Sequence, residues 1–184
     1  MRLFVAIEIT NEIRNRIDEA MRQFGTNDFD IKFVDPVNLH LTVKFLGEVH
    51  EDKLHDIENG ISESVKKFEP FVISLGKMGY FGNPDHIRVI WIDVMEGRET
   101  ISEMIREVDT NLKHIRQENH KPSPHLTIGR VKSGRNREKL LETIDSLADV
   151  KFGEMNVDCV KLKSSNLEKS GPIYRDVKQF SLGG

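Results

Sequence analysis

Hydrophobic positions along the chain repeat with two different periods, which separate predicted strands from predicted helices. Period-two alternation and short apolar runs predict strands over 2–9, 31–34, 39–46, 71–81, 86–94, 124–131, 152–162 and 174–180. Apolar residues three and four apart predict amphipathic helices from about 11 to 24 and over 51–67, 98–117 and 136–148. Polar, turn-rich segments cover 25–30, 82–85 and 164–171. Strands and helices interleave with hairpin-like turns, so the pattern predicts an α+β fold with largely antiparallel sheets.

One tripeptide occurs twice within this pattern, in His40-Leu41-Thr42-Val43 and in His125-Leu126-Thr127-Ile128. Random placement predicts roughly 0.02 copies of such a tripeptide in a chain of this composition. Each copy follows a proline and precedes a polar loop and an amphipathic helix, and the two copies are separated by nearly half of the chain. The repeat predicts a single bilobal domain over 1–184. We expect two pseudo-symmetric lobes whose antiparallel sheets face a central cleft, with the helices outside.

Strand alternation predicts which side chains each motif presents. In the first copy His40, Thr42 and Lys44 share one face, and the opposite face packs on the core through Leu39, Leu41, Val43 and Phe45. In the second copy His125, Thr127 and Gly129 share a face, where the glycine leaves room beside the histidine. Arg130 has the wrong parity for this face unless Gly129 introduces a bulge.

These residues predict chemistry on a phosphate. One neutral and one protonated imidazole coexist near neutral pH, so a histidine pair can take a proton from water and give one to a leaving alkoxide. The hydroxyls of Thr42 and Thr127 can donate hydrogen bonds to phosphate oxygens, and Lys44 and Arg130 can neutralise phosphate charge. A single histidine and threonine on a strand face are most often a structural pair, but duplication of the whole motif favours a site.

Several other residues are weaker candidates. His120 lies in the loop before the second motif, from which it could reach the site. The basic stretch from Arg130 to Lys139 could contact RNA phosphates, although a solvated loop and helix start is the simpler interpretation. Nucleobases could stack on aromatic residues, but core packing is favoured for each of the candidates Phe45, Tyr80, Phe81 and Tyr174.

Composition limits the remaining possibilities. A net charge of −3 argues against a protein that coats long nucleic acid, so any RNA contact is expected to be local. Cys159 is the only cysteine, which excludes an intrachain disulfide and a cysteine metal cluster. His50 and His55 are five residues apart and do not share a helical face, so we expect no metal site and no cofactor there. The apolar run 1–9 is too short to span a membrane, so we predict a cytoplasmic protein.

The paired motifs resemble those of the two-histidine (2H) phosphoesterase superfamily, and in particular the RNA 2′,3′-cyclic phosphodiesterases, historically called 2′-5′ RNA ligases. The resemblance covers nearly the whole chain, including Arg2–Ile7, Asn38–Glu48, Arg88–Trp91, Pro124–Val131 and Gly171–Tyr174. It implies a bilobal α+β fold and metal-independent hydrolysis of a terminal 2′,3′-cyclic phosphodiester to a 2′-phosphomonoester.

The resemblance also implies individual roles. His40 would be the proton donor and His125 the proton acceptor; the two motifs alone do not distinguish them. RNA ends or nucleoside 2′,3′-cyclic phosphates would be the substrates, with no obligate protein partner. Two alternatives remain at this stage: joining of tRNA halves through a 2′-5′ bond, which reverses the reaction, and a non-catalytic module that binds RNA or nucleotides.

Overall fold

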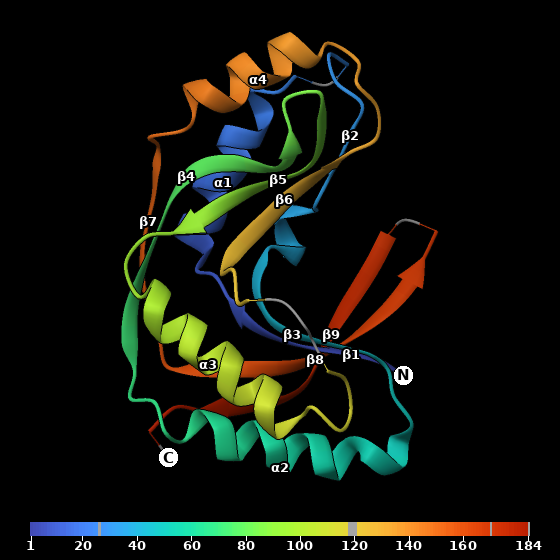
Figure 1. Ribbon diagram of the computed structural model, residues 1–184, viewed down its shortest axis with the longest axis vertical. Helices are drawn as coiled ribbons and strands as arrows, with labels where there is room; N and C mark the ends of the chain where they lie inside the picture. Colours follow the sequence, from blue (N-terminus) through green and yellow to red (C-terminus); the bar gives the residue numbers. More distant parts are fainter. Residues whose placement is uncertain (26, 118–120, 170, 184) are drawn as a thin grey trace.

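The computed structural model describes residues 1–25, 27–117, 121–169 and 171–183, and His120 lies outside them. Within this part of the chain the strands form two antiparallel sheets (Figure 1). The first sheet has the order β3-β1-β8-β9 and contains β1 (Arg2–Glu8), β3 (His40–Glu48), β8 (Cys159–Glu168) and β9 (Gly171–Ser181). The second sheet has the order β2-β6-β5-β4-β7 and contains β2 (Ile31–Phe33), β4 (Phe71–Asn83), β5 (His86–Val94), β6 (His125–Val131) and β7 (Lys151–Val157).

The two sheets repeat one arrangement. The order β3-β1-β8-β9 of the first sheet corresponds to β6-β5-β4-β7 of the second, so the motif strands β3 and β6 occupy equivalent positions. In each sheet the motif strand pairs with the strand that begins its half of the chain, β1 or β5. The predicted bilobal α+β fold is confirmed. The second sheet also has β2 added at the edge next to β6, a strand without a counterpart in the described part of the first sheet.

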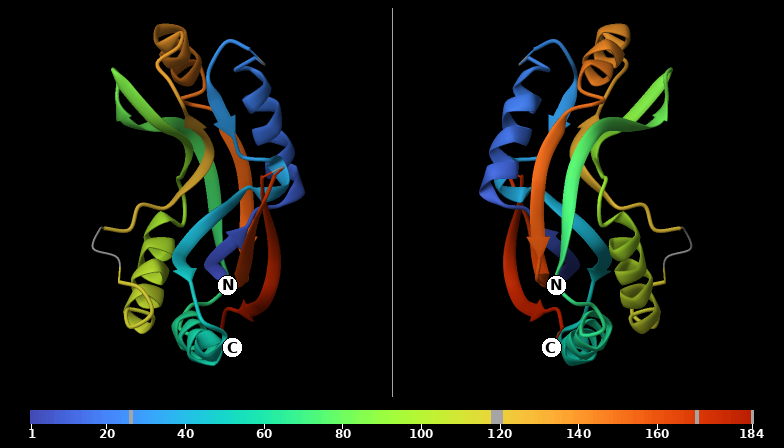
Figure 2. Two further views of the ribbon diagram at one scale, coloured as in Figure 1. Left: turned by 90° about the vertical axis from the view of Figure 1, so that its right-hand side faces the viewer. Right: turned by 90° about the vertical axis from the view of Figure 1, so that its left-hand side faces the viewer.

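Two of the helices are exchanged between the lobes. α1 (Asn11–Arg22) follows β1 of the first sheet but packs against β7 of the second, and α3 (Arg98–Asn111) follows β5 of the second sheet but packs against β3 of the first. α2 (Leu54–Val65) lies beside α3, whereas α4 (Arg137–Ser146) packs against β4 (Figure 2). Short 3₁₀ turns, η1 (Pro36–Asn38) and η2 (Glu51–Lys53), precede β3 and α2. The lobes are therefore not sequential halves of the chain.

Amphipathic spacing explains how the helices pack. In α1 the side chains of Ile13, Ile17 and Met21 are buried, and the Thr10 hydroxyl caps the helix by accepting a hydrogen bond from the Ile13 N–H. Buried apolar residues from both sheets and all four helices form one continuous hydrophobic cluster among the described residues. The opposite face of each sheet does not pack on this cluster and can carry polar side chains.

The helix predicted over 98–117 ends earlier, at Asn111, and two predicted segments of the sheets also differ from the structure. The segment predicted as one strand over 152–162 is two strands, because the chain passes from the second sheet to the first at Asp158. The polar segment 164–171, predicted as a turn, extends β8 to Glu168 and pairs with β9. The error over 164–171 has a clear cause: a hairpin that projects from a sheet carries polar residues on both faces and lacks the alternation on which the prediction depends.

A β-bulge occurs at the same position in both motif strands. Thr42 pairs with Ala6 and Lys44 with Val5, which leaves Val43 unpaired in β3. In β6 the residue left unpaired in the same way is Ile128. An extra residue in one strand reverses the alternation beyond it. Side chains therefore change face after Ile128 in β6, and after Val43 in β3 as far as a second bulge at Leu46.

The bulge corrects the predicted position of Lys44. Instead of sharing a face with His40, Lys44 is on the core side, where its side chain is 1% exposed and its ammonium pairs with Asp109 of α3. Phe45, predicted to pack on the core, changes to the motif face and is 49% exposed. The prediction that Lys44 neutralises a bound phosphate is therefore wrong.

In β6 the bulge places Arg130 on the motif face, whereas in β3 it removes Lys44 from that face. Arg130 is exposed and lies on the face of His125 and Thr127, as expected if a bulge was present, but the bulge is at Ile128 and not at Gly129. Gly129 itself lies on the core side, so it does not make room beside the histidine. A Cβ atom there would lie 2.9 Å from Ile31 and 3.1 Å from Phe33, so the glycine allows β2 to pack against β6.

The ion pair of Lys44 and Asp109 generates a stability prediction. Asp109→Ala leaves a buried ammonium without its partner, which we expect to lower the free energy of unfolding by about 2–4 kcal/mol. The exposed pair Lys67–Glu107 uses the same helix, so Glu107→Ala serves as the control, with an expected loss of about 0.5 kcal/mol. Urea denaturation measures both, and equal losses would contradict the assignment.

Candidate active site

The backbone before β3 fixes the His40 ring. Its Nδ1 donates a hydrogen bond to the Asn38 carbonyl oxygen at 2.7 Å, at the end of the η1 turn. A carbonyl only accepts, so Nδ1 carries a proton and Nε2 is the atom that can exchange one. The Thr42 hydroxyl lies 3.1 Å from this Nε2. The first motif thus places a titrating nitrogen and a hydroxyl on one small surface.

His125 is held in the same way. Its Nδ1 donates to the carbonyl oxygen of Ser123 at 2.6 Å, two residues before the histidine, as in the first motif. Nε2 is again the atom available for proton exchange. Thr127 follows two positions along β6 and is half-buried on the same face. The two motifs therefore match in ring orientation as well as in sequence.

A carboxylate lies directly across the sheet from each histidine. Glu8 of β1 is the register partner of His40, and Asp93 of β5 is the register partner of His125. Directly opposed residues of antiparallel strands share a face, so each carboxylate lies beside its imidazole. The sequence analysis missed both residues. The available signal was a lone acidic side chain at the end of each of the apolar strands 2–9 and 86–94.

Cations neutralise both carboxylates. Lys161 contacts Glu8 at 2.6 Å and Asp176 at 2.7 Å, and the largely buried Lys163 pairs with the same two carboxylates. These contacts lower the pKa of Glu8 against the opposing effect of burial. Asp93 pairs with Arg98 at the start of α3. Asp93 and Arg98 are five residues apart, so this ion pair is local to the junction of β5 and α3.

Burial determines the charge state of the imidazoles. It lowers the pKa of His40, an effect that the Asn38 carbonyl opposes and the Lys163 charge reinforces. Burial likewise lowers the pKa of His125, against the opposing effects of the Ser123 carbonyl and Asp93. Desolvation disfavours the charged imidazolium, so both rings hold a proton less tightly than a histidine in water.

Aromatic side chains surround both histidines. The His40 ring centroid is 5.0 Å from that of Phe4 and 5.5 Å from that of Tyr174, and the His125 centroid is 4.8 Å from that of Phe81. Three of the four aromatic residues considered from sequence, Phe45, Phe81 and Tyr174, thus lie on the motif faces. Tyr80 instead packs against the hydrophobic cluster.

Trp91 covers the middle of the second motif face. It is the register partner of Thr127 on one side and of Gly79 on the other, and its ring lies 5.4 Å from that of Phe81. A Cβ atom at Gly79 would lie 2.5 Å from the indole, so only glycine allows the ring to lie across β4. The aromatic ring of Trp91 therefore covers the sheet surface beside Thr127.

The two motif faces approach each other. β3 contacts β6, and Tyr174 of the first sheet is close enough to Arg130 of the second to be influenced by its charge. Burial raises the pKa of Tyr174, and the Arg130 and Arg2 charges act in the opposite direction. Arg130 also acts on His125. The Arg130 guanidinium therefore adds positive charge to the region between the two motif faces.

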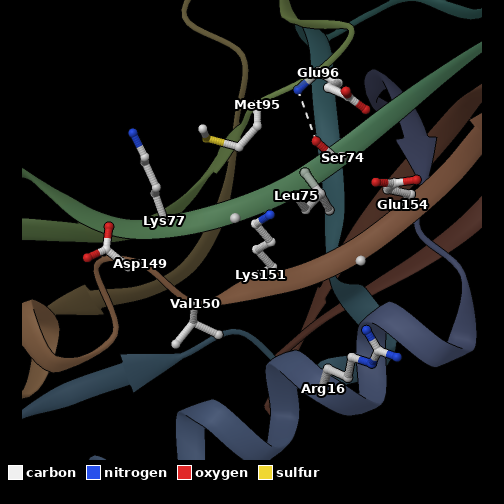
Figure 3. Close-up of a pocket in the computed structure, with 12 residues that line it drawn as sticks. Arg16, Ser74, Leu75, Lys77, Met95, Glu96, Asp149, Val150, Lys151 and Glu154 are labelled. Atoms are coloured by element: carbon white, nitrogen blue, oxygen red, sulfur yellow. Dashed lines mark hydrogen bonds between the residues drawn. The ribbon is translucent and has the colours of Figure 1, made fainter.

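A separate cavity of about 740 Å³ opens elsewhere, between β4, β7 and α1 (Figure 3). Its charged lining contains both signs, and neither motif histidine lines it. The lining cations are Arg16, Lys77 and Lys151, and the lining carboxylates are Glu96, Asp149 and Glu154. Over the described ranges, no group of three or more His, Cys, Asp or Glu residues could hold a metal ion. No helix within those same ranges is long and apolar enough to cross a membrane.

Comparison with known proteins agrees with this geometry. The family model described as LigT-like phosphoesterase matches residues 7–91 and again 92–174, one match for each repeat. RNA 2′,3′-cyclic phosphodiesterases of Methanothermobacter thermautotrophicus and Methanocaldococcus jannaschii are 42% and 41% identical; the alignments cover 99% and 98% of this chain and 99% and 100% of the relatives.

Solved structures give the same result. A crystal structure of the Thermus thermophilus protein TT0787 has a TM-score of 0.82 at 27% identity, over 100% of this chain and 99% of that one. The likeness extends over both sheets, and the repeated family match coincides with the repeated motif strands. The chain belongs to the family of LigT-like phosphoesterases.

Proposed function

We propose that this protein hydrolyses the terminal 2′,3′-cyclic phosphodiester of RNA to a 2′-phosphomonoester. The observation that carries the proposal is the matched pair of imidazoles, each with Nδ1 bonded to a carbonyl and Nε2 left for proton exchange. The relatives named RNA 2′,3′-cyclic phosphodiesterase, which align with nearly the whole chain, support the substrate class. The reaction needs positioning, two proton transfers and charge stabilisation, which the described residues supply.

In the proposed mechanism His125 takes a proton from water as the water oxygen forms a bond to phosphorus. The bond from phosphorus to O3′ breaks, and His40 gives its proton to the departing O3′. The product carries a 2′-phosphate and a 3′-hydroxyl, and the two imidazoles have exchanged protonation states. Thr42 and Thr127 donate hydrogen bonds to the phosphate oxygens, and Arg130, further along the same face, adds a positive charge that acts on the site through space.

The proposal also covers what the reaction requires, which substrates it accepts and where it takes place. The chain acts as a single bilobal unit without a metal, a cofactor or an obligate protein partner. RNA ends and nucleoside 2′,3′-cyclic phosphates are both substrates, and the location is cytoplasmic. Its single cysteine, Cys159, is compatible with a reducing compartment.

The first test removes each imidazole. We expect His40→Ala and His125→Ala each to reduce hydrolysis of an RNA 2′,3′-cyclic phosphate by about 10²–10⁴-fold, since each loses one proton transfer. Protein treated with EDTA should keep its rate, and the exposed His86 provides a control whose alanine variant stays active. The product's phosphate position is identified at the same time. Unchanged hydrolysis in both motif variants would refute the mechanism, and joined tRNA halves would favour the ligase alternative.

A second test separates the donor from the acceptor. Replacing O3′ by sulfur in the cyclic phosphate gives a leaving group that departs as a thiolate and needs no proton. We expect this substrate to restore most of the rate of His40→Ala and little of the rate of His125→Ala. Single-turnover rates with the oxygen and sulfur substrates measure the rescue. Rescue of His125→Ala alone would reverse the two roles.

The lowered pKa values generate a pH prediction. Catalysis needs one protonated imidazole, and burial lowers the pKa of both rings, so the competent state is lost as pH rises through these lowered values. We expect kcat/KM to reach its maximum below the ordinary histidine pKa of about 6.5 and to fall toward neutral pH. Asp93→Asn removes a charge that favours the His125 imidazolium. Because His125 must be neutral to accept the proton from water, the acid limb of the profile should move to lower pH. A maximum on the alkaline side of neutrality would contradict the prediction.

A further inference from the structure

β2 breaks the symmetry of the two lobes at the edge of the site. The first sheet ends at its motif strand β3, whereas the second continues past β6 to the three-residue strand β2. Ile31 and Phe33 of β2 pack against the hydrophobic cluster, so Lys32 between them points to the opposite face. That face is the one that carries His125 and Thr127.

Lys32 lies directly opposite Arg130. The two residues are register partners in the antiparallel pair of β2 and β6, and both side chains are exposed. Neither forms a salt bridge with any of the described residues. Two like charges directly opposed across a sheet destabilise it unless an anion lies between them. The chain as a whole carries a net charge of −3, so this pair is a local positive site on an acidic protein.

The position of Lys32 relative to the histidines indicates which anion it can bind. Arg130 influences His125 electrostatically, and Lys32 lies one strand further out, about 4.8 Å beyond β6. Along β6, Arg130 lies five residues past His125, roughly 15 Å for an extended strand. Lys32 is therefore displaced from the reacting phosphate both along the strand and across the sheet, so an anion bound there is not the reacting phosphate itself.

We propose that Lys32, with Arg130, forms a subsite for an internucleotide phosphate on the 5′ side of the terminal cyclic phosphate. This inference rests on the proposed function and deepens it, because it makes an RNA strand a better substrate than a nucleoside cyclic phosphate. The RNA leaves the histidines across the edge formed by β6 and β2. In the described part of the first lobe, which lacks a strand equivalent to β2, the position equivalent to Arg130 is the exposed Phe45.

Binding of product RNA tests the subsite independently of turnover. A fluorescent oligoribonucleotide ending in a 2′-phosphate is titrated with the wild-type protein and with Lys32→Ala, and the matching nucleoside 2′-phosphate competes against it. Loss of one contact to single-stranded nucleic acid lowers the slope of log K against log salt by about 0.7, or about fivefold in affinity at roughly 0.1 M salt. We expect this loss for the oligonucleotide, so the ratio of oligonucleotide to nucleotide affinity falls about fivefold.

Lys151 provides the matched control. It is an exposed lysine on β7, the opposite edge of the same sheet, so Lys151→Ala should keep the wild-type ratio and salt slope. Lys32→Arg should keep both as well, because it retains the charge. Thermal unfolding of each variant shows that the fold is intact. Wild-type ratio and slope in Lys32→Ala would overturn the subsite, whereas a wild-type protein that fails to hydrolyse either cyclic substrate would overturn the proposed function alone.

Discussion

The duplicated β-bulge is the constraint on which the site depends. Each motif strand must bury its apolar side chains and also present a histidine and a threonine, which simple alternation allows for only a few residues. The unpaired Val43 and Ile128 reverse that alternation. As a result Lys44 becomes a core residue paired with Asp109, and Arg130 joins His125 on the motif face.

Hydrogen bonds to nearby polar groups offset the loss of hydration when the two imidazoles are buried. Desolvation lowers both histidine pKa values, and each ring regains a hydrogen bond from Nδ1 to a carbonyl two residues earlier. The carboxylates opposite the rings are neutralised by neighbouring cations: Glu8 pairs with lysines, and Asp93 pairs with Arg98. Rings held in this way are preorganised for proton transfer at Nε2.

The lobes are alike in architecture and different in surface chemistry. The first motif face gathers aromatic side chains, with Phe4 and Tyr174 beside His40 and Phe45 beside Phe4. The second motif face carries the cation Arg130 on β6, and the extra strand β2 adds the cation Lys32 beside it. A duplicated scaffold thus positions two equivalent histidines, and the additions outside the repeat make the two sides of the pair chemically distinct.

The sequence by itself determined the existence of the repeat, the histidine pair, most element boundaries and the family. All of these depend on local periodicity or on short motifs, and the amino-acid order carries both. Only the tertiary structure decided that Lys44 is buried, that Gly129 accommodates β2, and that Glu8 and Asp93 face the histidines. A one-residue bulge leaves no clear trace in a hydrophobic pattern, and cross-strand register depends on how distant strands pair. For that reason the residues around the motifs could be placed only once both sheets were seen.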